Sequence, residues 1–152
     1  MKVKHDFTEV VNTFIAHGED GVNRKKEMEE LIGGFLQTVQ ESISKHFTKS
    51  FTCSSEPAPQ SVDDHSFFGI VKGGVRSENK FEVYIKEKRE GRLPRGFKLF
   101  SYEYDSVRGV PVTIRYNEGA VVCDDQEKVI RALSNMLSER AVAMVEWCLS
   151  AG

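Results

Sequence analysis

The apolar residues of this chain change their spacing twice, and these changes constrain the fold more than any other feature. From residue 7 to residue 47 they recur every three or four positions, which is the spacing of one helical face. Between residues 80 and 116 they alternate with polar residues, as in a strand that buries one face. Helical spacing returns after residue 128. The sequence therefore predicts an α+β protein in which helices precede and follow an antiparallel sheet.

The first 49 residues predict two helices. Gly18 is a stop signal after the first apolar stripe, and Asp20-Gly21 predicts a turn. Asn23 is a suitable N-cap for the second helix. Within the second stripe, Gly33-Gly34 costs about 0.5–1 kcal/mol per glycine relative to alanine, so we expect a close approach of another element or a kink there. The two stripes consist of Phe7, Val10, Val11, Phe14 and Ile15, and of Met28, Leu31, Ile32, Phe35, Val39, Ile43 and Phe47.

A polar segment with Pro57 and Pro59 follows, and residues 50–65 predict a flexible connector. Two helices alone would bury too little apolar surface to form an independent core. The 152 residues are therefore expected to form a single domain over 1–152. Its expected parts are a helical region (1–49), the connector (50–65), a sheet (66–122) and a C-terminal helix (123–150).

The predicted sheet is a four-stranded antiparallel meander. Pro111 cannot donate a ladder hydrogen bond, so the last strand lies at an edge or begins there. The Gly73-Gly74 pair predicts a bulge or turn near the end of the first strand. The expected strands are Phe67 to Val75, Lys80 to Lys86, Phe97 to Asp105 and Val110 to Tyr116.

The third predicted strand has apolar residues on both faces. If Tyr102 and Tyr104 face the core, Glu103 faces solvent opposite Arg115 or Lys80. Such two-sided strands indicate that a second subunit or a ligand covers the second face of the sheet. The alternative is that the N-terminal helices cover one face and the C-terminal helix the other.

The C-terminal segment predicts a helix packed on the sheet. Asp124 and Glu127 resemble a capping box at its start. The residues at helical spacing are Ile130, Leu133, Leu137, Ala141, Met144 and Cys148, widened by Val129, Met136, Val145 and Leu149.

Charge is distributed unevenly along the chain. The formal net charge is −2, yet residues 66–116 contain 11 Lys and Arg against 6 Asp and Glu. The basic residues concentrate in the expected hairpin at 86–98, which would bind an anion or a nucleic-acid backbone. The alternative is a solvated hairpin, and the sequence pI of 6.1 favours it. The candidate anion-binding residues are Lys86, Lys88, Arg89, Arg92, Arg95 and Lys98.

Other reactive side chains give little support for a catalytic or metal site. Asp63-Asp64-His65 would need His5 or His17 to complete a metal site, and the spacing matches no known ligand motif. Cys123 precedes a helix, but the adjacent Asp124 and Asp125 should raise its thiol pKa rather than lower it. We therefore expect no metal and no cofactor, and the sequence leans against an enzyme without excluding one.

The sequence predicts a non-catalytic protein-binding module that forms a homodimer or binds another protein. Three widely spaced cysteines, no apolar signal sequence and no stretch long enough to span a membrane lead us to expect a cytoplasmic protein. One alternative function is nucleic-acid or anion binding through the 86–98 hairpin. Another is a small-molecule binding protein or enzyme with a pocket between sheet and helices. The residues proposed for that pocket are Tyr102, Glu103, Arg115 and His65.

Overall fold

The computed structural model describes residues 6–59, 76–105 and 107–150. The elements are α1 (Thr8–Phe47), β1 (Phe51–Pro59), β2 (Arg76–Glu87), β3 (Arg95–Tyr104), β4 (Val112–Tyr116), β5 (Gly119–Cys123) and α2 (Gln126–Leu149). The described strands form one antiparallel sheet in the order β1-β2-β3-β4-β5. The predicted α+β class and the meander are confirmed, with five described strands in place of four. The predicted strand at 67–75 lies outside the described residues.

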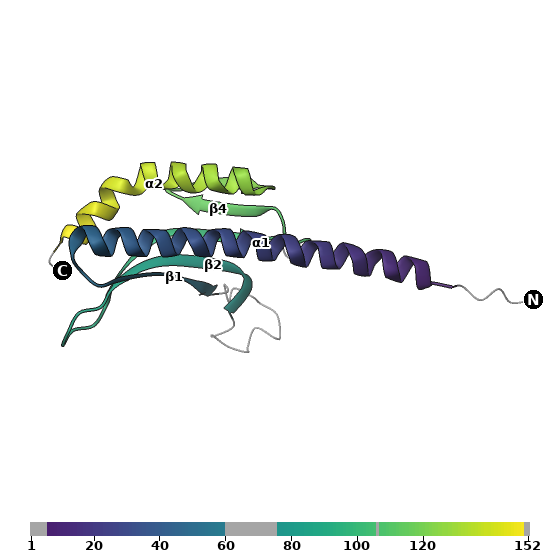
Figure 1. Ribbon diagram of the computed structural model, residues 1–152, viewed down its shortest axis with the longest axis horizontal. Helices are drawn as coiled ribbons and strands as arrows, with labels where there is room; N and C mark the ends of the chain where they lie inside the picture. Colours follow the sequence, from purple (N-terminus) through teal and green to yellow (C-terminus); the bar gives the residue numbers. More distant parts are fainter. Residues whose placement is uncertain (1–5, 60–75, 106, 151–152) are drawn as a thin grey trace, which may run out of the picture.

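Both helices pack against the same face of the sheet (Figure 1). Phe35 of α1 contacts the Phe100 ring of β3, with 6.2 Å between the ring centroids. Trp147 of α2 contacts Phe97 of β3 and Phe51 of β1, each at 5.7 Å. The molecule therefore has two layers, and the alternative in which the helices cover opposite faces is wrong.

The second face of the described sheet is polar. Glu103 lies between Lys80 and Arg115, with carboxylate-to-cation distances of 3.7 and 3.6 Å. This is the pairing expected if the tyrosine face of β3 is buried, and Tyr102 and Tyr104 are both buried. The argument that an uncovered apolar sheet face requires a dimer therefore does not hold for the described strands. Dimerisation itself stays a prediction.

Strict alternation would place apolar residues of β3 on both faces of the sheet, and a β-bulge explains why they all lie on one face. Val83 pairs with Phe100 while the next residue of β2, Tyr84, pairs with Lys98, so Leu99 is an extra residue in β3. Leu99 and Phe100 are adjacent and both buried. The bulge turns both side chains toward the helices, which strict alternation does not allow.

α1 is one continuous helix, so the predicted break at Gly18 and Asp20-Gly21 is wrong. Gly21 is instead a point of close contact, because a Cβ built on it would lie 2.9 Å from the Arg108 carbonyl oxygen. Gly109 has a φ of +80°, and a Cβ there would lie 2.8 Å from the Gly21 carbonyl oxygen. The two glycines let the β3–β4 loop touch the helix backbone. No such contact exists at Gly33-Gly34, where a Cβ would meet nothing within 4 Å, so the expected close approach there is wrong.

Two strands differ from expectation. Most of the predicted connector is β1, which buries Phe51 and Cys53 and pairs with β2. As an edge strand it tolerates prolines that an inner strand would not. β5 was not predicted, although Asn117 and Glu118 have φ values of 51° and 69°, which are typical of a two-residue type I′ hairpin turn. Pro111 directly precedes β4, which is an inner strand.

The C-terminal helix is confirmed, but its cap and its buried face are shifted. Asp125, not Asp124, is the N-cap, and its side chain accepts a 2.8 Å hydrogen bond from the Lys128 amide. Ile130, Val145 and Leu149, expected to be buried, are exposed. The buried residues of α2 are Val129, Ala132, Leu133, Met136 and Cys148.

Candidate functional site

The N-terminal part of α1 extends beyond the sheet (Figure 1). Every residue from 6 to 20 is exposed, and the first buried residue of the helix is Met28. We call residues 7–20 the arm. A helix of 40 residues is about 60 Å long at 1.5 Å per residue, whereas the 12-residue β2 spans only about 40 Å. The helix is therefore too long for the sheet to cover.

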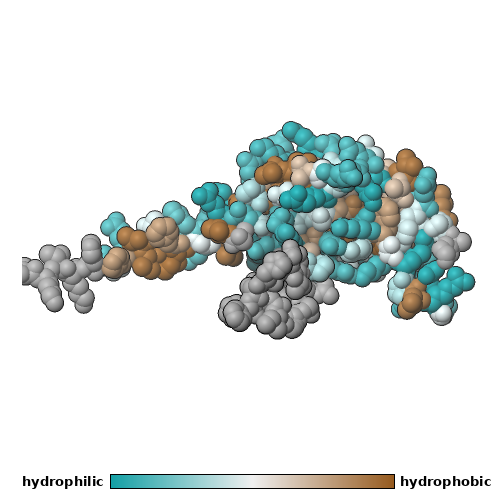
Figure 2. Space-filling view, turned by 180° about the vertical axis from the view of Figure 1, so that it is seen from behind, coloured by the Kyte–Doolittle hydropathy of each residue, from teal (hydrophilic) through white to brown (hydrophobic). Residues whose placement is uncertain are grey.

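The arm carries an apolar stripe that no described residue buries. Phe7, Phe14, Gly21 and Met28 follow one another at intervals of seven, so the stripe continues the face that α1 buries in the core. In Figure 2 this stripe is the brown patch on the projecting part of the helix. Its members are Phe7, Val10, Val11, Phe14 and Ile15, with Val22 at its base, and each is 50–66% exposed. Apolar side chains that continue a core face are typical of an interaction surface.

Intrinsic propensity gives the arm little helical stability. It contains β-branched residues at Val10, Val11 and Ile15, and a glycine at position 18. These residues form helix less readily than alanine or leucine. Helices of this length are marginal in water without packing on one face. The arm is therefore a segment that gains stability when its apolar stripe is covered.

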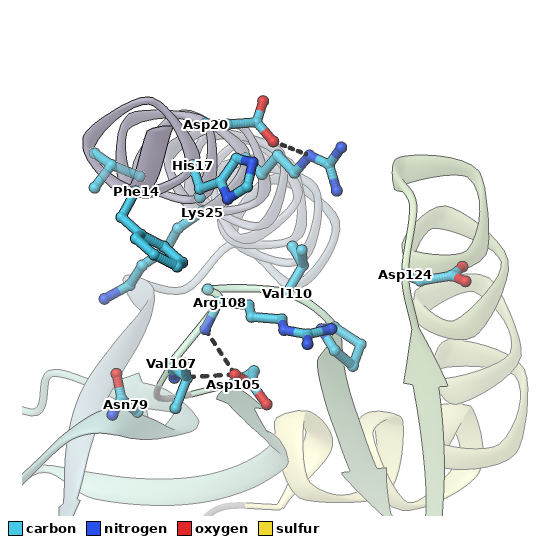
Figure 3. Close-up of a pocket in the computed structure, with 16 residues that line it drawn as sticks. Phe14, His17, Asp20, Lys25, Asn79, Asp105, Val107, Arg108, Val110 and Asp124 are labelled. Atoms are coloured by element: carbon cyan, nitrogen blue, oxygen red, sulfur yellow. Dashed lines mark hydrogen bonds and ion pairs between the residues drawn. The ribbon is translucent and has the colours of Figure 1, made fainter. Parts of the chain in front are cut away.

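A groove of about 800 Å³ opens at the base of the arm, between α1 and the β3–β4 loop (Figure 3). The Asp105 carboxylate shapes this loop by accepting hydrogen bonds from the amides of Val107 at 2.9 Å and Arg108 at 2.7 Å. The same two bonds lower the pKa of Asp105. The groove is lined on the helix side by Phe14, His17 and Lys25, and on the loop side by Val107, Arg108 and Val110.

The arm and its base differ in charge. The arm contains three carboxylates, those of Glu9, Glu19 and Asp20, and Asp6 directly precedes it. The groove at the base is mixed in charge: Arg24, Lys25 and Arg108 line it together with Asp20, Asp105 and Asp124, and Asp20 pairs with Arg24 at 3.1 Å. Lys25 and Lys26 follow Arg24, and the Lys25 ammonium lies 5.3 Å from the centroid of the Tyr104 ring. Along α1, the acidic arm is thus followed by three consecutive cations at residues 24–26.

The six candidate anion-binding residues do not form one cationic surface. Lys86 pairs with Glu56, and Lys98 lies 3.7 Å from Glu82. The Arg89 guanidinium donates to the Leu93 carbonyl oxygen, whereas Lys88 and Arg92 are exposed.

Arg95 belongs to a structural ion-pair network. It donates to Glu87 at 2.8 Å, and both side chains are nearly buried, with 11% and 13% exposed. Its guanidinium also covers the Trp147 ring at 4.2 Å and donates to Ser150. Lys49 joins the network by donating to the Cys148 carbonyl oxygen at the end of α2. The Lys49 ammonium also lies 3.8 Å from the Glu87 carboxylate. This network connects α2 and the segment after α1 to the β2–β3 hairpin. Anion binding by the hairpin stays a prediction.

The residues proposed for a sheet–helix pocket do not converge. Tyr102 is buried on the helix-covered face, whereas Glu103 and Arg115 lie on the polar face. His65 lies outside the described residues, as do Asp63 and Asp64.

The cysteines of the protein are free and buried. Burial raises the pKa of Cys53 to about 12. Burial also raises the pKa of Cys123, with further contributions from Asp125 and Asp124, as the sequence predicts. These thiols therefore stay protonated and are poor nucleophiles.

Among the described residues, no three His, Cys, Asp or Glu side chains form a cluster able to hold a metal ion. Neither described helix combines the length and hydrophobicity needed to cross a bilayer.

Sequence reasoning assigned the apolar residues of the arm to a packed helix and missed the groove residues Lys25 and Arg108. No protein-family model, curated protein or solved structure matches this chain.

Proposed function

We propose that this protein is a non-catalytic interaction module that binds a protein partner through the arm. The observation that carries the proposal is the apolar stripe, which continues the core face of α1 beyond the last residue that the domain covers. A surface of this kind fits a partner helix, because side chains at spacings of three and four can interdigitate with those of a second helix.

The polar side chains of the described residues support binding better than catalysis. The buried thiols are protonated, Glu103 is engaged in ion pairs on the solvent-facing side of the sheet, and the nearly buried Glu87 is paired with Arg95. A catalytic site needs a nucleophile or base that a third group orients in a cavity. The groove contains His17, but the nearest ring contact of His17 is Phe14, at 6.0 Å between centroids.

Photo-cross-linking tests the proposed interface directly. A photoreactive phenylalanine analogue replaces Phe14 in the arm, and in a control protein it replaces Val142, which is exposed on α2. We expect a protein adduct from position 14 and none from position 142, both with purified protein and in an extract of expressing cells. If position 14 gives no adduct in either setting, the arm is not an interface and the proposal fails.

Nucleic-acid binding through the 86–98 hairpin remains the second candidate. Its support is the exposure of Lys88 and Arg92 near the turn. Because phosphate contacts release counterions, such binding should weaken steeply with salt. Arg89→Ala combined with Arg92→Ala should abolish it without unfolding the protein. Unchanged binding by this variant would exclude the hairpin.

A further inference from the structure

The position of the groove relative to the arm indicates what kind of partner fits. Both lie on the core-facing side of α1, and Phe7 at the tip is 18 residues from Lys25 at the base, or about 27 Å along the helix. A partner helix that covers the stripe must therefore end in the groove. The arm itself has the length, the apolar spacing and the charge for this role.

We propose that the arm pairs antiparallel with the arm of a second copy of this chain, so that the tip of each arm enters the groove at the base of the other. This inference rests on the proposed function and names the partner of the same surface. With the two-fold axis near residue 16, Phe7 lies opposite Lys25 of the second copy. Phe14 then lies opposite Gly18, and Val11 lies opposite Gly21, next to Val22.

Charge complementarity selects the antiparallel orientation. Asp6, at the acidic tip of one copy, approaches the Arg24-Lys25-Lys26 run of α1 in the other. A parallel pair would instead place Asp6, Glu9 and the other carboxylates of the arm beside their own copies, which is repulsive. The same carboxylates disfavour an anionic lipid surface as the partner.

Packing also favours a helix as the occupant. A Cβ built on Gly18 would meet nothing within 4 Å, so the described fold gives no reason for a glycine there. In the antiparallel pair, Gly18 leaves room for the Phe14 ring of the second copy. The groove has space for a large side chain such as Phe7 at the tip.

The size of the interface predicts a weak dimer. Six half-exposed apolar side chains per copy would bury about 500 Å² of surface on each copy, or about 1,000 Å² in total. This area is near the lower limit for a specific interface. We therefore expect a dissociation constant in the micromolar range, with monomer and dimer in exchange.

Sedimentation velocity over a range of concentrations tests self-pairing. The mass should rise from 17.2 kDa at low micromolar concentration toward twice that value at submillimolar concentration. Phe14→Asp and, as a second variant, Val10→Asp should weaken the dimer by about a hundredfold. Val142→Asp introduces the same charge at an exposed apolar residue of α2 and should leave the dimer unchanged. Both arm positions are exposed, so circular dichroism should find the domain folded.

Disulfide trapping tests the orientation. The native cysteines are buried, so Val11→Cys and Val22→Cys introduce the only readily oxidised thiols among the described residues. When differently tagged chains carrying one substitution each are mixed, we expect the 11–22 disulfide to form first. Faster formation of the 11–11 disulfide would show a parallel pair and overturn the proposal.

The outcomes separate this inference from the proposed function. A chain that remains monomeric at every concentration overturns self-pairing. If the photoreactive group at position 14 then links a different protein, the interaction function stands with another partner. If it links nothing, both proposals fall.

Discussion

Replacing Gly21 with alanine tests whether the β3–β4 loop holds α1 by backbone contact. The added Cβ would lie 2.9 Å from the Arg108 carbonyl oxygen, so the helix or the loop must move. Such overpacking costs about 1–3 kcal/mol, against a gain in helix propensity of about 0.5–1 kcal/mol. Gly33→Ala is the matched control, because it gives the same propensity gain in the same helix with nothing within 4 Å.

The two variants should therefore differ by about 1–3 kcal/mol in the free energy of unfolding, with Gly33→Ala stabilising and Gly21→Ala destabilising. Urea denaturation measures this difference, followed both by circular dichroism and by the fluorescence of the single tryptophan, Trp147. The protein is kept at low concentration so that association does not contribute. If Gly21→Ala stabilises the protein as much as Gly33→Ala, the loop does not hold the helix and the assigned role of Gly21 is wrong.

Three further predictions follow from the buried polar groups. Arg95→Ala removes the nearer cation of the nearly buried Glu87 carboxylate, leaving Lys49 at 3.8 Å, and should cost about 2 kcal/mol in urea denaturation, whereas the exposed Arg92→Ala should change stability by less than about 0.5 kcal/mol; equal effects would contradict the structural role. Among the described residues the buried Tyr104 hydroxyl has no hydrogen-bond partner, whereas that of Tyr102 is bonded to a serine. Tyr104→Phe should therefore raise the unfolding free energy slightly and Tyr102→Phe lower it by about 1 kcal/mol, and the reverse order in thermal melts would refute this. Burial raises the native pKa of Cys53 from 9.0 to about 12, so its contribution to stability is complete below about pH 9 and is lost as the pH rises toward 12. The urea midpoint should fall above about pH 9, and a constant midpoint there would contradict this account.

The sequence predicted the elements whose apolar pattern is regular. Strict alternation around Val83 and Ile85 located β2, and helical spacing located α2. β1 was missed because an edge strand tolerates the two prolines that favoured a connector. β5 was missed because most of this short edge strand is exposed, so it shows little burial pattern.

The errors in α1 arose from reading glycine as a local signal. Gly21 occurs in the helix because the β3–β4 loop approaches it there, which is a contact between residues 87 positions apart. No local rule distinguishes such a glycine from a turn. The predicted break also divided the apolar stripe in two. The sequence therefore did not reveal that a single helix extends beyond the sheet.

The candidate site was partly visible in the sequence. The residues of the arm stripe were recognised as apolar at helical spacing, but their exposure depends on where the sheet ends. The groove depends on the contact between Gly21 and Gly109, which only the tertiary structure shows. Similarly, Arg95 was grouped with the hairpin cations because its Glu87 and Trp147 partners lie far from it in the sequence or across a strand pair.

Amide hydrogen exchange as a function of protein concentration tests the central claim that the arm is an interface. An uncovered arm should exchange fast, because its helix has no packing to protect it. We expect protection of residues 9–20 to increase between low micromolar and submillimolar protein, while that of α2 stays constant. Exchange in the arm that is independent of concentration and as fast as in an unfolded peptide would contradict pairing. Strong protection already at the lowest concentration would contradict the claim that the arm needs a partner.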